Sequence, residues 1–456
     1  MTMNPLYKKV LKKITPTKKE VLAEQKLVSQ IREKLKKLEG KHSHLEWCGS
    51  SARGTHLRGD RDLDLFIMFH KELPAQQLEE EGLRLAKTIF QGHKWEKAYS
   101  QHPYIRGEIK GFEVEIVPSY IVASGAEKQS AVDRTPFHNK YLLEKLTDTQ
   151  KAEARLLKQF LKGINAYGAD LKNCSLPGYG AELFIVTFKT FENTIKALAK
   201  MRPGEVIDFG TGIERAQKLF EKEHYPLIII DPVDSNRNVA SALSAEQFER
   251  MILAANLFLK KPNIKFFFPK KSKTWPKKKI QKMLTKKELI AISANFPQTV
   301  LSDLVWGQLR RYLKKVETHL RENDFEVTQS GLWSDEKKVI FLFELTSLNL
   351  QQAKKVIGPM ANDIENTKRF LEKKRITISG PRVEGERIVI EIQREETSAH
   401  KLLERFTKKC LIDEKEAMRL CLHKAKILSE KNILKEYKNG FAEYLTQYLE
   451  GKEAFE

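Results

Sequence analysis

Cysteine is scarce in this 456-residue chain: there are four, at positions 48, 174, 410 and 421, and none belongs to a CxxC pair. This argues against a zinc ribbon and against a disulfide framework, and it fits a reducing compartment. Long apolar runs are also missing, because stretches such as LIII and FFF are far shorter than the ~20 residues of a membrane span. The N-terminal segment has no apolar core of signal-peptide length. We therefore expect a soluble, cytoplasmic protein.

Acidic residues are outnumbered. The chain has 81 Lys and Arg against 60 Asp and Glu, which gives a formal net charge of +21 at pH 7. Such a charge favours a polyanionic partner, nucleic acid first and an anionic membrane surface second, although solvated lysine faces are the ordinary alternative. The hydrophobic content of 41% is ample for packed cores, and the length predicts about three domains.

The first third of the chain has the pattern of a mixed α/β domain that ends near residue 140. A long amphipathic helix, capped by Thr15 or Thr17, opens it, and a second helix is predicted at 74–90. Apolar or alternating segments predict strands at 43–50, 62–69, 104–110 and 112–118.

The remainder is helical at first and then mixed. Residues 148–262 have mainly helical spacing, apart from a short apolar strand in YPLIIID. The stretch 260–287 is dense in lysine and carries aromatic residues, which a linker would lack. We expect it to open a third, basic domain. Those aromatic residues are Phe266, Phe267, Phe268 and Trp275.

Two carboxylates stand one residue apart in the apolar segment DLDLFIMF. On a strand, Asp62 and Asp64 project from the same face. Neighbouring like charges on a buried strand are costly, so we expect a hard cation such as Mg²⁺ to neutralise them. An EF-hand is excluded, because Leu65 stands where that loop needs glycine, and no GxxxxGK[ST] phosphate loop is present. An isolated Asp-x-Asp is more often part of a surface turn, but this one follows a turn whose residues can bind phosphate.

The turn before the strand carries phosphate-binding chemistry. Gly49 and Ser50 can offer backbone N–H groups and a hydroxyl, and Arg53 a planar fork of donors. Gly-Ser, eleven residues and then Asp-x-Asp resembles the signature of the DNA polymerase β-type nucleotidyltransferases. The stretches SAVDRTPFHNKYL, LLKQFLKGINAYGA, GYGAELFIV and IIIDPVDSNRNVA, which follow in the same order, closely resemble the archaeal, class I CCA-adding enzymes, which are tRNA nucleotidyltransferases.

The resemblance covers about residues 20–270 and implies a role for individual residues. A third carboxylate on a later strand completes the metal site, and Glu115 matches it, with Glu113 in reserve. Family members usually have Asp at this position, and the extra methylene of Glu115 could alter the preference between Mg²⁺ and Mn²⁺. The implied metal ligands and catalytic residues are Asp62, Asp64 and Glu115. The implied nucleotide-binding residues are Ser50 and Arg53 for the incoming ATP or CTP, His138, Lys158 and Tyr167 for its triphosphate, and Arg237 for its base.

The same resemblance implies an α+β multidomain fold: a polymerase β-like nucleotidyltransferase head with a mixed sheet, a helical central domain, and α/β C-terminal domains that bind RNA. The expected limits are 1–145 for the catalytic head, 146–262 for the central neck domain, 263–325 with 400–456 for the body, and 326–399 for the tail.

The implied reaction adds C, C and A to the 3′ end of tRNA from CTP and ATP, without a template and with two metal ions. The implied partners are tRNA, ATP, CTP and a second copy of the chain, with no membrane. Two alternatives stay open. The chain could be a nucleotidyltransferase that makes poly(A) or an oligoadenylate, or a tRNA-binding protein with a decayed site.

Overall fold

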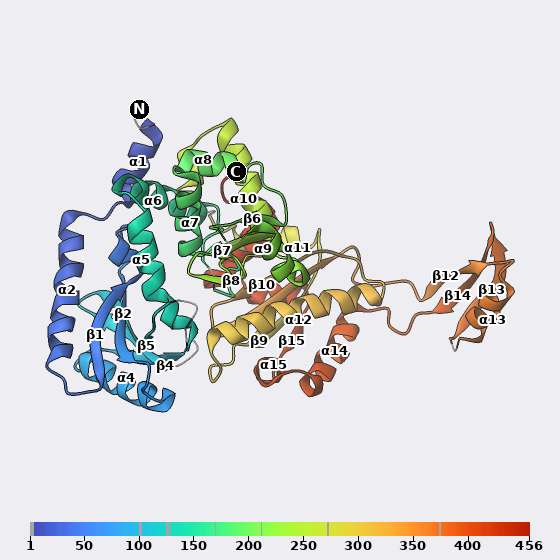
Figure 1. The fold of residues 1–456 in the computed structure, drawn as a ribbon. Helices are drawn as coiled ribbons and strands as arrows, with labels where there is room; N and C mark the ends of the chain where they lie inside the picture. The colour runs from blue at the N-terminus through green and yellow to red at the C-terminus, as the bar shows by residue number, and fades with distance from the viewer. Residues whose placement is uncertain are drawn as a thin grey trace. The chain divides into compact units, whose positions relative to one another are not determined.

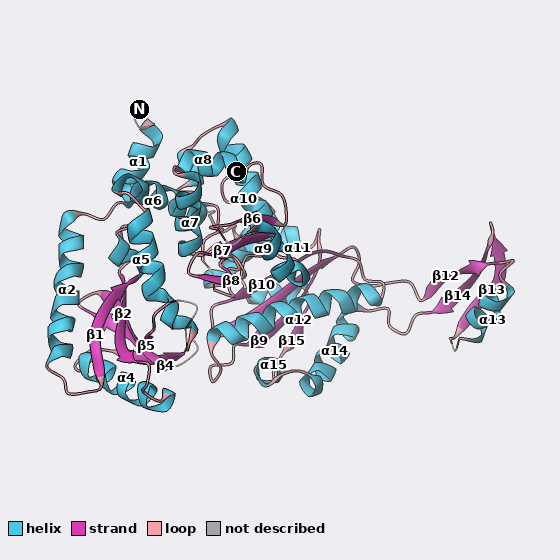
Figure 2. Ribbon diagram, viewed as in Figure 1, coloured by secondary structure: helices cyan, strands magenta, loops and turns pink. Residues whose placement is uncertain are grey.

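The fold is that of a computed structural model (Figure 1), which describes residues 4–99, 103–124, 127, 129–168, 170–210, 212–270, 273–373 and 375–456. The chain forms two compact units. One consists of Met1–Lys271 with Glu453–Glu456, and the other of Ser272–Lys452. Both units combine helices with strands (Figure 2). No helix in the described ranges is both long and apolar enough to cross a membrane.

A five-stranded mixed sheet forms the first layer of the first unit. Its order is β1-β2-β5-β4-β3, and only the central pair β2 and β5 is parallel. The core under this sheet is made of alternate strand residues and the apolar sides of α2 and α4. The bounds are β1 (His42–Cys48), β2 (Asp62–His70), β3 (Trp95–Tyr99), β4 (Pro103–Ile109), β5 (Phe112–Ile121), α2 (Lys18–Lys36) and α4 (Ala75–Ile89).

Helix α2 begins with a capping box. Oγ1 of Thr17 accepts a hydrogen bond from the backbone N–H of Glu20 at 3.2 Å, and the Glu20 carboxylate accepts one from the N–H of Thr17 at 2.6 Å. Each side chain satisfies a donor that the first helical turn leaves free. The predicted helix is confirmed, and of the two candidate caps Thr17 is the right one, since Thr15 ends the preceding helix α1 (Pro5–Ile14).

The rest of the first unit is mainly helical, as the pattern predicts, with one small three-stranded sheet. Its large core also receives side chains from α1. The elements are α3 (Gly49–Arg53), α5 (Thr135–Lys145), α6 (Asp148–Gly163), α7 (Gly178–Phe188), α8 (Phe191–Leu198), β6 (Glu205–Ile207), α9 (Ile213–Phe220), β7 (Leu227–Asp231), β8 (Asp234–Asn238) and α10 (Ala245–Lys260), with short 3-10 turns at Ala131–Arg134, Glu221–Glu223 and Ile264–Phe266.

The aromatic triplet 266–268 differs from the expectation. Phe266 and Phe267 are 3% and 0% exposed and belong to the core of the first unit, so they are not part of a basic surface that opens the next domain. The backbone of Phe266 lies so close to Gly163 at the end of α6 that a β-carbon there would overlap with it. The lysines around the triplet hide this packing in the sequence, because local charge does not reveal which distant helix covers an apolar side chain.

The second unit contains two antiparallel sheets, of order β10-β11-β9-β15 and β12-β14-β13. Apolar side chains of α12, α14 and α15 form a core with the first of these sheets. The bounds are α11 (Lys277–Leu284), β9 (Glu288–Asn295), α12 (Ser302–Glu322), β10 (Val327–Ser334), β11 (Lys338–Leu345), β12 (Ala353–Met360), α13 (Ile364–Glu372), β13 (Thr377–Glu384), β14 (Arg387–Gln393), α14 (Ala399–Asp413), α15 (Glu416–Leu422), β15 (Lys426–Leu428), α16 (Glu430–Lys435) and α17 (Asn439–Glu450).

Candidate active site

The three predicted metal carboxylates lie on the two parallel strands at the centre of the first sheet. In the register of β2 and β5, Asp64 is opposite Glu115 and Asp62 is opposite Glu113. Apolar neighbours such as Leu63 face the core on the other side, as the alternation predicts. Pairing of residues 51 positions apart along the chain therefore brings Glu115 beside the Asp-x-Asp pair.

Burial and mutual repulsion disfavour ionisation of these carboxyl groups. Burial, followed by the charge of Asp62, raises the pKa of Asp64 to about 6. Burial, followed by the charge of Asp64, raises the pKa of Glu115 to about 7. The pKa of Asp62 is also raised, first by burial and then by Glu113. The ionised carboxylates therefore repel one another, and a bound cation would reduce this repulsion.

The chemistry of this donor set fits the metal that the sequence predicts. Only carboxylate oxygens face the site from Asp62, Asp64 and Glu115, and hard cations such as Mg²⁺ prefer oxygen ligands. As the side chains stand, no three His, Cys, Asp or Glu residues within the described ranges converge closely enough to hold an ion. The metal assignment therefore rests on the donor chemistry and the raised pKa values.

Glycine is required where the phosphate-binding turn meets the catalytic strand. Gly49 has a φ of +79°, in the left-handed region, and a β-carbon on it would overlap with a carboxylate oxygen of Asp64. Ser50 is the next residue of the helical turn α3, which begins at Gly49 directly after β1. The glycine of the Gly-Ser pair thus has a structural explanation that does not depend on any ligand.

Arg53 and Lys158 meet on one buried carboxylate, which sequence analysis missed. Nη2 of Arg53 lies 2.8 Å from Oε2 of Glu182, and Nζ of Lys158 lies 2.9 Å from its Oε1. The hydroxyl of Thr55 donates to Oε1 as well. All of these side chains are buried, and Glu182 is fully so. The segment after β1 is thereby joined to α6 and α7.

The charge balance of this cluster favours an anion. Burial by itself would raise the pKa of Glu182, but Arg53 and Lys158 outweigh it and lower that pKa to about 2. Burial also lowers the pKa of Lys158, against the attraction of Glu182. Arg53 and a protonated Lys158 would outnumber the one carboxylate in this dry site, so a bound anion would favour the charged form of Lys158. Nε of Arg53 is buried and has no hydrogen-bond partner in the part of the chain that is described. A phosphate oxygen would supply the missing acceptor and charge.

Tyr167 lies against the same cluster. A β-carbon on Gly178, the first residue of α7, would be 2.6 Å from the Tyr167 hydroxyl and 3.7 Å from Cε of Lys158. Burial raises the pKa of Tyr167, which keeps its hydroxyl protonated and able to donate. Nζ of Lys162 lies 5.4 Å from the centre of the Tyr167 ring and forms an ion pair with Asp60 at 2.9 Å.

His138 and Arg237 form a separate cluster around Asp231. Nε2 of His138 and Nη1 of Arg237 lie 2.8 and 2.9 Å from Oδ2 of Asp231, which is fully buried. The Tyr179 hydroxyl donates to Oδ1 at 3.3 Å. The helix that carries His138 also joins the two clusters, because Oδ1 of its next residue, Asn139, accepts from Nη1 of Arg53 at 3.3 Å.

The structure thus gathers the predicted residues into a carboxylate group, an Arg53–Lys158–Tyr167 group and a His138–Arg237 group. Sequence reasoning missed the two acids that hold the cations, Glu182 and Asp231. Both stand inside motifs that it quoted, GYGAELFIV and IIIDPVD. The sequence signal that could have identified them is an acidic residue within an apolar run, because a buried acid needs a cationic partner.

Three family models match consecutive parts of the chain. They are the nucleotidyltransferase domain over 28–138, the second domain of tRNA nucleotidyltransferase over 152–268 and the C-terminal domain of CCA-adding enzyme over 286–413. The CCA-adding enzyme of Methanosarcina mazei is 34% identical over 409 residues, 88% of each chain. That of Sulfurisphaera tokodaii is 32% identical over 367 residues, 80% of this chain and 84% of its own.

The chain belongs to the CCA-adding enzymes. The nucleotidyltransferase match spans all five strands of the first sheet, so the predicted α+β, multidomain fold with a polymerase β-like head is confirmed. A solved structure of the Cid1 poly(U) polymerase aligns with a TM-score of 0.46 at 18% identity, over 59% of this chain and 99% of that one.

Proposed function

We propose that this chain adds C, C and A to the 3′ end of tRNA, taking the nucleotides from CTP and ATP without a template and releasing pyrophosphate. Its relatives carry the name of this activity at 32% to 34% identity over most of their length. The observation that carries the proposal for this chain is the register that sets Asp64 beside Glu115, with the Arg53–Lys158 pair nearby.

The reaction is an in-line displacement at phosphorus. The 3′-hydroxyl oxygen of the RNA forms a bond to the α-phosphorus of the nucleotide, and the bond from that phosphorus to the bridging oxygen breaks. Glu115 is proposed to accept the hydroxyl proton: burial raises its pKa to about 7 in the metal-free protein, and a bound cation would return it to the carboxylate form that can take a proton. Two Mg²⁺ ions, held by Asp62, Asp64 and Glu115, would lower the pKa of the hydroxyl and neutralise charge on the leaving group.

The remaining predicted residues would position the nucleotide. Arg53 and Lys158 supply fixed positive charge for the triphosphate, and fixed charges need no reorganisation when the reaction occurs. Ser50, Tyr167 and His138 are proposed to donate to the same phosphates. Arg237, whose side chain is 32% exposed against 13% for His138, is proposed to contact the base.

The test uses tRNAs that lack one, two or three nucleotides of the CCA end, with CTP and ATP supplied separately. The proposal predicts CTP incorporation into the two shorter tRNAs and ATP incorporation into the tRNA that ends in CC. A poly(A)-type enzyme would instead extend all of them with ATP. If no nucleotide is added in either Mg²⁺ or Mn²⁺, the chain is a binding protein and the proposal fails.

We further propose that the enzyme works as a homodimer in the cytoplasm. The resemblance of its motifs to the class I family supports the first statement, and the tRNA substrate supports the second. The side chain of Glu115 is one methylene longer than that of the usual Asp, so we propose that it affects the preference between metals. Glu115→Asp should then change the ratio of Mn²⁺- to Mg²⁺-supported activity.

A further inference from the structure

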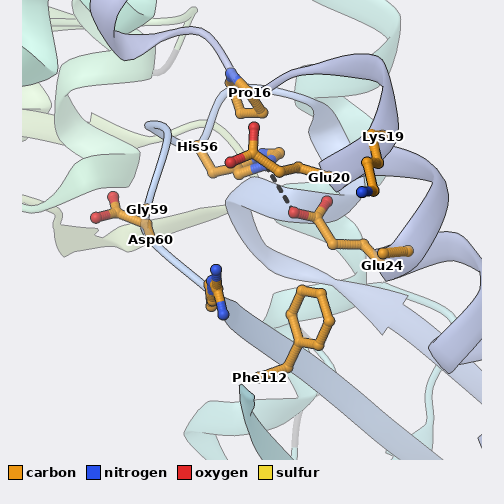
Figure 3. A pocket seen from close by; sticks show the side chains of 10 residues that line it. Pro16, Lys19, Glu20, Glu24, His56, Gly59, Asp60 and Phe112 are labelled. Atoms are coloured by element: carbon orange, nitrogen blue, oxygen red, sulfur yellow. Dashed lines mark ion pairs between the residues drawn. The ribbon is translucent and has the colours of Figure 1, made fainter. Parts of the chain in front are cut away.

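A second cavity lies beside the catalytic strand, apart from the residues expected to hold the incoming nucleotide. Its volume is about 230 Å³, and it is lined by the start of α2, the loop 56–61 that leads into β2, and Phe112 at the start of β5 (Figure 3). All of these segments belong to the first unit. None of the residues assigned to the metal or the nucleotide lines it.

Two buried polar side chains line this cavity without satisfying each other. Figure 3 shows Glu24 and His56 facing one another, with Oε1 of Glu24 3.2 Å from Nε2 of His56 and side-chain exposures of 5% and 4%. In the described part of the chain, Oε2 of Glu24 and both ring nitrogens of His56 lack an aligned hydrogen-bond partner. Buried polar atoms in this state cost free energy, which a ligand with its own donors and acceptors would recover.

The remaining lining suits a flat aromatic ring that carries a phosphate. Phe112 is only half-buried, and the guanidinium carbon of Arg61 lies 5.9 Å from the centre of its ring. Phenylalanine rings and guanidinium planes are the groups on which proteins stack unpaired bases. Lys19 and Arg61 bring positive charge to the cavity, and the Glu20 carboxylate, which also lines it, is engaged by the N–H of Thr17 and by Arg58. The Asp60 carboxylate is turned away in Figure 3 and is engaged by Lys162.

The cavity is next to the reacting end of the site. A larger groove of about 620 Å³ shares Gly59 and Arg61 with it and is lined by Asp62 and Glu113 on the carboxylate face of the sheet. An RNA strand whose 3′ end lies at Asp62 would therefore have this cavity within reach of its last nucleotides.

We propose that the Glu24–His56–Phe112 cavity is a nucleobase pocket, which takes a base by stacking on Phe112 and by hydrogen bonds to the Glu24–His56 pair. The base comes either from the unpaired end of the RNA or from a free nucleotide. The first source rests on the function proposed above, and the second does not.

Fluorescence of 2-aminopurine tests this directly, because stacking on an aromatic ring quenches it. One probe is tRNA without CCA whose last unpaired nucleotide is 2-aminopurine, and the other is the free 2-aminopurine ribonucleoside monophosphate. The full-length protein should quench one of the two, and the probe that responds identifies the source. Phe112→Leu, which keeps an apolar side chain, should remove most of the quenching and weaken binding of that probe about tenfold.

Glu24→Gln provides a second variant, which alters the hydrogen bonding and preserves the side-chain shape. It should weaken binding of the same probe. Tyr99→Leu is the matched control, since Tyr99 is an aromatic residue on β3, 50% exposed and outside the cavity lining, and it should leave the quenching unchanged. The proposal is overturned if neither probe is quenched, or if quenching persists in both Phe112→Leu and Glu24→Gln. Because quenching needs no turnover, it separates failure of the pocket from failure of CCA addition.

Discussion

At the scale of single residues, Glu182 is the acid on which two predicted phosphate-binding cations depend. Its neutralisation leaves Arg53 and Lys158 buried without a counter-charge. Breaking a buried pair in this way costs about 3–5 kcal/mol of unfolding free energy. We expect Glu182→Gln to lower stability by that amount in chemical denaturation and to raise the KM for CTP and ATP at least tenfold, since the two cations lose their fixed positions.

Glu153→Gln is the matched control for this prediction. Glu153 is a half-buried carboxylate on α6 that accepts one hydrogen bond from the backbone N–H of Phe191 and contacts neither cation. Its loss should cost about 1 kcal/mol and leave the KM values unchanged. Equal effects of the two substitutions would contradict the positioning role of Glu182.

The same residue predicts a dependence of stability on acid. The folded-state pKa of Glu182 is about 2, below its ordinary value of 4.5. Its contribution is therefore complete above pH 4.5 and is lost as the pH falls from 4.5 toward 2. Denaturation of the wild type across this window should show a loss of stability that Glu182→Gln does not share. Parallel curves for the two proteins would show that the buried pair does not titrate.

The pKa of Asp64 is shifted in the opposite direction, so its effect on stability also has the opposite dependence on pH. Its folded-state pKa is about 6 against an ordinary 3.8, so the folded state loses stability as the pH rises from 3.8 to 6. Asp64→Asn should therefore stabilise the metal-free protein at pH 7 by up to about 3 kcal/mol while abolishing nucleotide addition. Millimolar Mn²⁺ should raise the Tm of the wild type and not that of the variant. A variant that Mn²⁺ stabilises equally would show that the ion binds elsewhere.

At the scale of elements, the sequence was sufficient for the catalytic strand and its faces. The alternation in DLDLFIMF predicts which side of β2 carries the carboxylates. The start of helix α2 is also predictable from sequence, because its capping residues lie within one turn of each other. The pairing of β2 with β5 depends on contacts far apart in sequence, and so the place of Glu115 came from family resemblance. Glu182 lies 129 residues from Arg53, and no periodicity reports that contact.

The aromatic triplet gives an element-scale prediction. Phe267 is fully buried, with ring centres of Phe160, Phe191 and Phe258 at 5.5 to 5.8 Å. Phe267→Ala should cost about 3–5 kcal/mol of stability, because it opens a cavity in this core, without changing RNA affinity under conditions where the protein is folded. Phe268→Ala, at a partly buried neighbour, should cost less. Weaker RNA binding with unchanged stability would contradict this prediction and indicate that the triplet contacts RNA.

At the scale of the whole molecule, the net charge of +21 makes binding of RNA an electrostatic event. Neutralising about six phosphates implies a roughly thousandfold loss of affinity for tRNA between 50 and 200 mM salt. A titration at several salt concentrations measures this slope, and a flat response would mean that the excess lysines are only solvated. Sedimentation of the same samples should show a species of twice the chain mass, as the proposed homodimer requires.

Nucleotide addition to tRNA by this chain is proposed to depend on Asp62 and Asp64. The most direct measurement is incorporation of labelled CTP into tRNA without CCA by the wild type and by Asp62→Asn, with tRNA affinity measured in parallel. We expect addition of two C residues by the wild type, none by Asp62→Asn, and comparable affinity for both. Undiminished addition by Asp62→Asn would contradict it.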